Sequence, residues 1–254
     1  MNNQCLLIEK SSEGWALITL TRPDKFNTLS IAMRQSMEAK IVELELDSEI
    51  HVLILTGSGN FFTAGLDLDE WESSEGQSAA AFKHDFVATL KQFRGPVIAA
   101  VNGPAITGGL EIVLACDFIV AANDAKFADT HVHVGLLPGW GGSVRMIERV
   151  GLARAKELAF TGHFFSAEDA HRWGLVNHLV QPADLLPFCQ NLACQMLKAD
   201  PVHLKTYKAL IDQEAQLILG SALAHEQEKA KVVNSYSSLV QIKNRLKKFT
   251  RSKN

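Results

Sequence analysis

The chain has 254 residues, 47% of them hydrophobic, and a formal net charge of -3 at pH 7. This length and composition suffice for a large buried core and exclude a disordered chain. The charge gives no general basic surface for nucleic acid, and the basic residues within 243–253 are interpreted as a solvated charged end. No apolar run approaches the roughly 20 residues of a membrane span, so we expect no membrane partner.

The cysteines lack paired metal-ligand spacing, so no metal site is predicted. Cys116 lies in an apolar segment, as a small core residue does. The N-terminal sequence MNNQCLLIEKSSEGW has neither the apolar run of a signal peptide nor the arginine-rich character of a transit peptide. These features favour a reducing compartment, and we expect a soluble, cytoplasmic protein.

The N-terminal part has the pattern of an α/β protein. Two β-rich runs, 6–9 and 15–20, are separated by serines and glycine, which predicts a hairpin. Ser30 is the expected N-cap of a helix that ends near residue 47, because apolar residues recur there at helical spacing. Residues 51–56 form a continuous apolar run, as in a strand buried on both faces. Strand, helix and buried strand in this order favour an α/β layout.

A turn with the sequence FFTAGLDL follows at residues 61–68. Its small residues allow close approach of the backbone to a ligand, and free N–H groups near a helix start can bind a developing negative charge. An ordinary strand-to-helix turn explains the same residues. After it we expect a polar loop at 73–81 and a helix at 81–93.

Residues 97–150 hold most of the candidate chemistry. A buried strand at 97–101 is followed by a turn, and Gly108 opens a helix that reaches Cys116. Since this helix is apolar almost all round, Glu111 on it requires a partner or a water-filled pocket. The residue is interpreted either as a functional carboxylate or as half of a buried structural ion pair.

Strands are expected next at 118–122 and 126–128, followed by Asp129, Thr130 and His131. The expected later elements are a helix that ends near residue 150, a helix at 153–160, a short helix capped by Ser166 with Asp169, a strand at 174–180, and helices at 184–198, 201–212, 217–235 and 239–249. The change to helical sequence predicts a core at 1–190 and a helical region at 191–254, which packs on the core or on a neighbouring subunit.

Several motifs occur together and in order over nearly the whole chain. They are RPDKFNTL at 22–29, FFTAGLDL at 61–68, PVIAAVNGPAITGGLEIVLACDF at 96–118, HVGLLPGWGG at 133–142 and GLV at 174–176. With these motifs the chain resembles the enoyl-CoA hydratase/isomerase, or crotonase, family. The resemblance implies an α/β fold built as a crotonase-like spiral of repeated ββα units, with a helical C-terminal region. It also implies a homotrimer or a dimer of trimers.

Proteins of this family stabilise the enolate of an acyl-CoA thioester with two backbone N–H groups. The matching positions here are Leu66 and Gly108. Both follow small residues at turn-to-helix junctions, where orphan N–H groups and the helix dipole favour a negative oxygen. Glu111 matches the first of the two catalytic glutamates of the hydratases, which holds and activates the added water.

His131 stands where a typical hydratase has its second catalytic glutamate, which exchanges a proton with the carbon next to the thioester. Histidine can act there as acid or base, and Asp129 is a candidate to orient its ring. The alternative is a hydrogen-bonded structural histidine. By alternation, His133 is expected to point elsewhere.

The resemblance thus implies a hydro-lyase that adds water across the 2,3 double bond of a trans-2-enoyl-CoA. Another acyl-CoA reaction of the family (isomerisation, thioester hydrolysis or decarboxylation) and a non-catalytic acyl-CoA-binding homologue are the alternatives. Family isomerases often keep the second carboxylate and dispense with the first, the reverse of the pattern at Glu111 and His131. No cofactor is implied, because coenzyme A is part of the substrate.

Coenzyme A is expected along the FFTAGLDL turn, with its adenine near the turn and its phosphates near two basic residues. The residues implied are Arg22, Lys25, Thr63, Ala64 and Leu68. Lys248 and Phe249 from the tail of a neighbouring subunit are candidates to complete this site. A solvated, lysine-rich end explains those two residues equally well.

Overall fold

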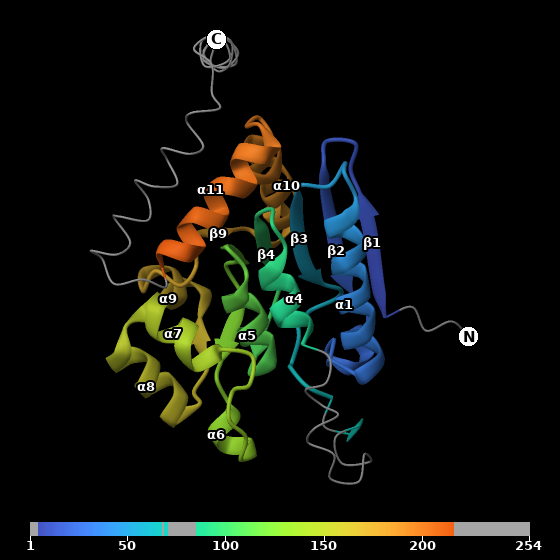
Figure 1. Ribbon diagram of the computed structural model, residues 1–254. Coiled ribbons are helices and arrows are strands. Elements are labelled where there is room, and N and C mark those ends of the chain that lie inside the picture. Colours follow the sequence, from blue (N-terminus) through green and yellow to red (C-terminus); the bar gives the residue numbers. More distant parts are fainter. Residues whose placement is uncertain (1–4, 68, 71–84, 216–254) are drawn as a thin grey trace. The chain divides into compact units, whose positions relative to one another are not determined.

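The computed structural model describes residues 5–67, 69–70 and 85–215 (Figure 1). The chain divides into two compact units, Met1–Leu204 and Lys205–Asn254. The described residues of the second unit belong to helix α11 (Pro201–Glu214) and its end. The domain division expected at residue 190 stays a prediction; that residue lies inside α10 (Leu185–Met196). The helices expected at 217–235 and 239–249 lie outside the described residues, as does the loop expected at 73–81.

The first unit contains a six-stranded sheet with the order β1-β2-β3-β4-β6-β9. Its first two strands form the predicted antiparallel hairpin, and the remaining neighbours pair in parallel, for example Ile54 with Ile98. Parallel neighbours require crossover connections, which here contain the helices, so the predicted α/β class is confirmed. The strands are β1 (Leu6–Lys10), β2 (Trp15–Leu20), β3 (Val52–Gly57), β4 (Val97–Val101), β6 (Phe118–Ala122) and β9 (His178–Val180).

Strand β9 is shorter than the expected strand at 174–180. Gly174 has a φ of +83° and follows helix α9 (Ala167–Arg172), so the chain is still turning there. A second sheet has three short strands, β5 (Ala105–Ile106), β7 (Lys126–Ala128) and β8 (Phe165–Ser166). Of these, the sequence predicted β7 alone. The second sheet matters for function because β5 leads directly into α5 (Gly108–Ala115).

Three of the described helices begin where a short polar side chain caps them. The Oγ of Ser30 accepts the N–H of Met33 at 3.1 Å, as expected, and the Oγ of Ser166 accepts the N–H of Asp169 at 3.0 Å. Asp85 caps α4, which therefore begins later than residue 81. The helices not yet given are α1 (Ile31–Leu46), α4 (Phe86–Gln92), α6 (His131–Val134), α7 (Gly142–Val150) and α8 (Leu152–Thr161).

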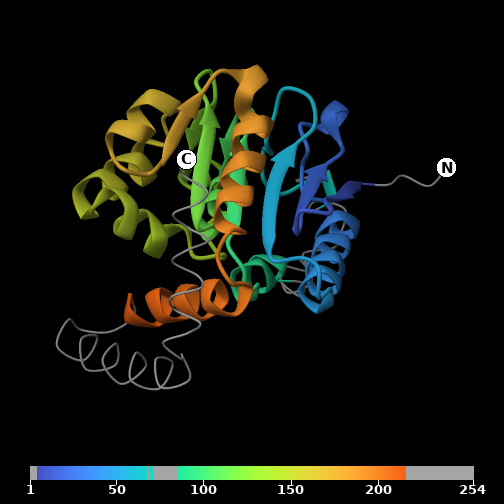
Figure 2. The ribbon, with the colours of Figure 1, turned by 90° about the horizontal axis from the view of Figure 1, so that it is seen from above.

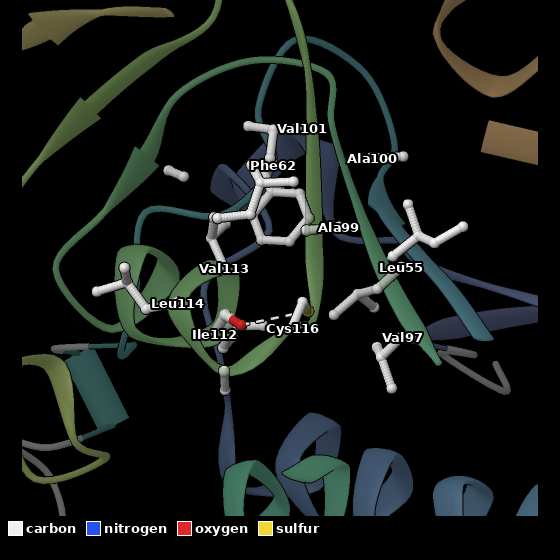
Figure 3. Close-up of a cluster of buried hydrophobic side chains, with 14 of the residues drawn as sticks. Leu55, Phe62, Val97, Ala99, Ala100, Val101, Ile112, Val113, Leu114 and Cys116 are labelled. Atoms are coloured by element: carbon white, nitrogen blue, oxygen red, sulfur yellow. Dashed lines mark hydrogen bonds between the residues drawn. The ribbon is translucent and has the colours of Figure 1, made fainter. Parts of the chain in front are cut away.

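The core of the first unit surrounds β3, β4 and α5, which are buried at every position. Helix α10 runs along the sheet strands, against β2, β3, β4 and β6 (Figure 2). Phe62, Val101 and Val113 belong to the cluster drawn in Figure 3, where the Sγ of Cys116 donates to the carbonyl of Ile112 at 3.4 Å. Helix α5 is thus packed on all sides, and the position of Glu111 is fixed by the core. Across the described ranges, no helix combines the length and apolar character required to span a bilayer.

Candidate active site

The start of α5 is held in an uncommon backbone conformation. Its N-cap residue, Thr107, has φ 54° and ψ -109°. A β-branched residue rarely has a positive φ, so neighbouring groups must hold it. The Thr107 amide donates to the carbonyl of Ala128 at 2.8 Å, and its Oγ1 lies 2.5 Å from the Oγ1 of Thr130. The Thr107 carbonyl accepts the N–H of Glu111 at 3.0 Å. These bonds fix the direction of the first turn of α5.

The turn at residues 61–67 lies against this helix start. Leu29 donates to the carbonyl of Gly65 at 2.8 Å and accepts from Asp67 at 3.5 Å, so the N–H of Leu66 points away from Leu29. A Cβ on Gly65, whose φ is +92°, would lie 3.1 Å from the amide nitrogen of Gly108. Within the described part of the chain, neither Leu66 N–H nor Gly108 N–H has a hydrogen-bond acceptor. The structure thus brings the two predicted amides together at a helix start, where the helix dipole favours negative charge.

Glu111 lies one turn after Gly108, on the same face of α5, and is 3% exposed. Its Oε1 accepts backbone N–H groups from Trp140 at 2.8 Å and Gly142 at 3.0 Å. A Cβ on Gly142 would lie 2.9 Å from the Cγ of Glu111, which explains the glycine at the start of α7. The indole ring of Trp140 covers Gly108, where a Cβ would lie 2.9 Å from Cζ3. Backbone groups therefore hold Oε1, and Oε2 is the carboxylate oxygen turned toward His131.

His131 is the first residue of α6 and is buried. Its Nε2 lies 3.5 Å from the Oε2 of Glu111, and its Nδ1 lies 2.6 Å from the Oδ1 of Asp129. Burial alone would lower the pKa of His131, but the hydrogen bonds and charges of Asp129 and Glu111 outweigh it and raise the pKa to about 9. The ring is therefore an imidazolium at neutral pH, with a proton on each nitrogen. His133 points elsewhere, as expected, with its Nε2 2.8 Å from the carbonyl of Thr161.

The two basic residues expected to bind phosphate differ in their surroundings. The Arg22 guanidinium lies 2.9 Å from the carboxylate of Asp67 and donates to the carbonyl of Thr28 at 2.6 Å. Burial would raise the pKa of Asp67, but Arg22 outweighs this effect and lowers it. Lys25 is exposed and lies 3.5 Å from Asp69. Arg22 is thus already paired within the protein, whereas the ammonium group of Lys25 is accessible to a ligand.

The residues expected near the adenine form part of a tightly bonded turn. Thr63 is fully buried, and its Oγ1 donates to the carbonyl of Asn27 at 2.7 Å. Ala64 is partly buried, and its N–H donates to the carbonyl of Phe26 at 3.1 Å. Thr63 therefore contributes to the turn through its side chain, and Ala64 is the one of the two with surface open to a ligand. The other expected contacts, Leu68, Lys248 and Phe249, lie outside the described residues.

Sequence reasoning missed the groups that position Glu111 and the first turn of α5. Trp140 and Gly142 supply the bonds to Glu111, and Thr107 and Thr130 join α5 to the segment before α6. The glycine-rich HVGLLPGWGG motif was the sequence signal from which Trp140 and Gly142 could have been found. The sequence carries no comparable signal for the two threonines.

Known proteins resemble this chain in sequence and in fold. The model of the enoyl-CoA hydratase/isomerase family matches residues 10–251. The chain therefore belongs to the enoyl-CoA hydratase/isomerase family, as its motifs indicated.

Two relatives and one solved structure illustrate the likeness. The chain is 34% identical over 230 residues to the probable peroxisomal enoyl-CoA hydratase 1 of Arabidopsis thaliana, covering 91% of this chain and 87% of that protein. It is 36% identical over 232 residues to the short-chain-enoyl-CoA hydratase of Clostridium acetobutylicum, covering 90% and 88%. The crystal structure of an enoyl-CoA hydratase from Bacillus anthracis superposes with a TM-score of 0.91 at 30% identity, covering 96% of both chains. The predicted crotonase-like fold is confirmed.

Proposed function

We propose that this protein is an enoyl-CoA hydratase, a hydro-lyase that adds water across the 2,3 double bond of a trans-2-enoyl-CoA. The observation that carries the proposal is the buried pair of Glu111 and His131, with Oε2 and Nε2 3.5 Å apart beside the start of α5. The family of the chain and the names of its relatives support a coenzyme A thioester as the substrate. No cofactor takes part in the proposed reaction.

The thioester carbonyl oxygen accepts hydrogen bonds from the N–H groups of Leu66 and Gly108. When the oxygen of water bonds to C3, electrons move from the double bond and the thioester becomes an enolate. Its negative oxygen then lies at two amide donors and at the positive end of the α5 dipole. Such a donor typically contributes about 3 kcal/mol of transition-state stabilisation.

Glu111 and His131 move the protons. The Glu111 carboxylate takes a proton from the attacking water, and the imidazolium of His131 gives its Nε2 proton to C2 of the enolate. The product is a 3-hydroxyacyl-CoA, whose hydroxyl group comes from the water and whose new hydrogen at C2 comes from His131. Transfer of the proton from Glu111 to the neutral ring of His131 restores the starting state. This cycle requires His131 to be charged before the reaction, which agrees with its raised pKa of about 9.

The test is to incubate the purified protein with short-chain and medium-chain enoyl-CoA substrates. Hydration removes the conjugated-thioester absorbance and yields a product heavier by one water in mass spectrometry. We expect turnover for at least one chain length. A folded protein that turns over none of them contradicts the proposal, and a product of isomerisation, hydrolysis or decarboxylation reassigns the reaction.

Coenzyme A lies along the turn at 61–68 in this proposal, with Lys25 as the accessible cation for a phosphate. Replacing Lys25 with glutamine should raise KM with little change in kcat, because the residue is remote from the acyl group. Unchanged KM would remove Lys25 from the site. The contacts from Lys248 and Phe249 are tested in the same way.

We propose a homotrimer or a dimer of trimers in the cytoplasm. Large apolar side chains are exposed on and between α6, α7 and α8, which is a reason to expect a subunit contact. They are Val132, Val134, Leu137, Val144, Ile147, Leu152 and Phe160. Light scattering coupled to size exclusion measures the assembly, and a monomeric mass would contradict it. Fractionation of the source cells tests the compartment.

A further inference from the structure

The carboxylate of Asp129 lies on the side of the His131 ring that faces away from Glu111, since it contacts Nδ1 and Glu111 faces Nε2. We propose that Asp129 is a positioning residue, which fixes the His131 ring with Nε2 turned toward Glu111 and stabilises its charged form. This inference rests on the proposed role of His131 as the proton donor to C2.

Asp129 holds both the ring and the backbone of the same residue. Its Oδ1 lies 2.6 Å from Nδ1 and also accepts the backbone N–H of His131 at 3.3 Å. A contact of 2.6 Å between a carboxylate and an imidazolium is a short, charge-assisted hydrogen bond. Because Asp129 holds both the backbone N–H and the Nδ1 of His131, the side chain is fixed in one orientation. When the ring is neutral, its remaining proton stays on Nδ1, where it is donated to Asp129. Nε2 is then the nitrogen left to exchange protons with the substrate and Glu111.

The segment that carries Asp129 is itself fixed against α5. Residue Ala128, directly before it, pairs with Ile106 of β5 and accepts the N–H of Thr107 at 2.8 Å. Thr130, directly after it, is joined to Thr107 through their hydroxyl groups at 2.5 Å. The residues on both sides of Asp129 thus contact Thr107, the N-cap residue of α5. The distance from His131 to Glu111 is set by the same contacts.

Two carboxylates face one imidazolium in this arrangement. Glu111 approaches from α5, and Asp129 approaches from the segment before α6. His133 on α6 contacts Thr161 of α8, and Arg145 of α7 donates to the carbonyl of Trp140. Among the described residues, Asp129 and Glu111 are the charged groups that act on the His131 ring. If Asp129 is made neutral, Glu111 is the remaining negative charge that favours the imidazolium form of His131 against the effect of burial.

The test is Asp129→Asn, which keeps an oxygen that can accept the N–H of His131 but removes the charge. The ring of His131 is titrated by NMR, with its signal assigned by its loss in His131→Gln. We expect the titration midpoint to fall from about 9 toward the ordinary value of 6.5. We also expect kcat to fall roughly 10²-fold with KM little changed, and the high-pH limb of activity to move to lower pH.

Two further variants separate positioning from folding. Asp129→Glu keeps the charge, so it should keep the raised titration and recover part of kcat. Asp124→Asn makes the same change of charge at an exposed position and should alter neither measurement. If Asp129→Asn does not fold, as judged by its melting curve, a normal His131 titration in Asp129→Glu overturns the proposal and a raised one supports it.

An unchanged titration and pH profile in folded Asp129→Asn would overturn the positioning role. The NMR measurement needs no turnover, so it remains informative if the wild-type protein fails to hydrate any enoyl-CoA. In that case a lowered midpoint in Asp129→Asn supports the contact while the proposed function fails.

Discussion

Glu111 and His131 face each other across the site, yet different kinds of group hold them. Backbone N–H groups of Trp140 and Gly142 hold the carboxylate of Glu111, whereas the side chain of Asp129 holds the ring of His131. Backbone donors remain after any substitution that keeps the local fold, whereas a single substitution removes a side-chain acceptor. We therefore expect the Glu111 region to respond to changes of backbone shape and the His131 region to respond to changes of charge.

The largest expected effect comes from Glu111→Gln, which tests the first half of this comparison. Glutamine keeps an oxygen for the two backbone donors but cannot take a proton from water. We expect kcat for hydration to fall roughly 10²–10⁴-fold, the range for loss of a general base. The variant should still fold because the two backbone hydrogen bonds remain, with a melting temperature lowered by the loss of the charged contact with His131. A loss of less than tenfold would show that Glu111 is not the base.

Gly65→Ala changes backbone shape without touching a charge. The new Cβ would lie 3.0 Å from the carbonyl of Ile106 and 3.1 Å from the amide of Gly108, at a φ of +92° that strains any side chain. We expect displacement of a proposed oxyanion donor and a loss of kcat of roughly 10²–10³-fold. Leu66→Met is the matched control, since it keeps the backbone N–H, and it should change kcat little. Equal losses in both variants would argue against a backbone donor at residue 66.

The pH dependence sharpens the second half of the comparison. Because His131 must carry its proton, kcat/KM should fall about tenfold per pH unit above a pKa of about 9.

The raised pKa of His131 also affects the stability of the folded protein. The pKa of His131 in the folded protein lies above its ordinary value of 6.5. The charged ring therefore adds to the free energy of unfolding in full below pH 6.5, and this added stability is lost as the pH rises through about 9. Urea unfolding gives the difference in the free energy of unfolding between the wild type and His131→Gln. This difference should shrink by on the order of 3 kcal/mol as the pH rises from 6.5 to about 9. A constant difference would contradict the raised pKa.

The elements predicted well are those fixed by neighbours in sequence. The hairpin, the Ser30 cap and the strands at 97–101 and 118–122 depend on apolar periodicity and local capping, and all are confirmed. The burial of Glu111 also followed from the apolar helix around it. The strand expected from residue 174 was wrong at its start, because the turn at Gly174 follows a helix whose end the sequence did not mark.

The partners of the site residues were harder to predict because they depend on tertiary contacts. Trp140 and Gly142 reach Glu111 from 29 and 31 residues away, and no periodic pattern spans that separation. Asp129 was a candidate partner of His131 because the two are close in sequence. Its short contact with Nδ1 depends on how β7 and α6 are joined, which the sequence does not specify.

The smallest expected effect comes from Thr130→Val, which removes the hydroxyl contact with Thr107 but no charge. We expect a loss of about 1 kcal/mol in the free energy of unfolding, the usual net value of one hydrogen bond, and a decrease of kcat of a few fold. Ser166→Ala is the matched control, because losing the cap of α9 costs a similar free energy at a position without a contact to Glu111 or His131. If both variants lower kcat equally, the threonine contact has no specific role in the site.

The backbone of Thr107 implies a conflict between durability and activity in this protein. A non-glycine residue in that conformation costs on the order of 1–3 kcal/mol, which the surrounding bonds must offset. Glycine would relieve the strain but would free the peptide that precedes the amide of Gly108. Glycine would also lose the hydroxyl contact with Thr130 and make the unfolded chain freer. Where the strain exceeds these two costs, selection for heat resistance alone should favour glycine at position 107, and the resulting proteins should be longer-lived but slower catalysts.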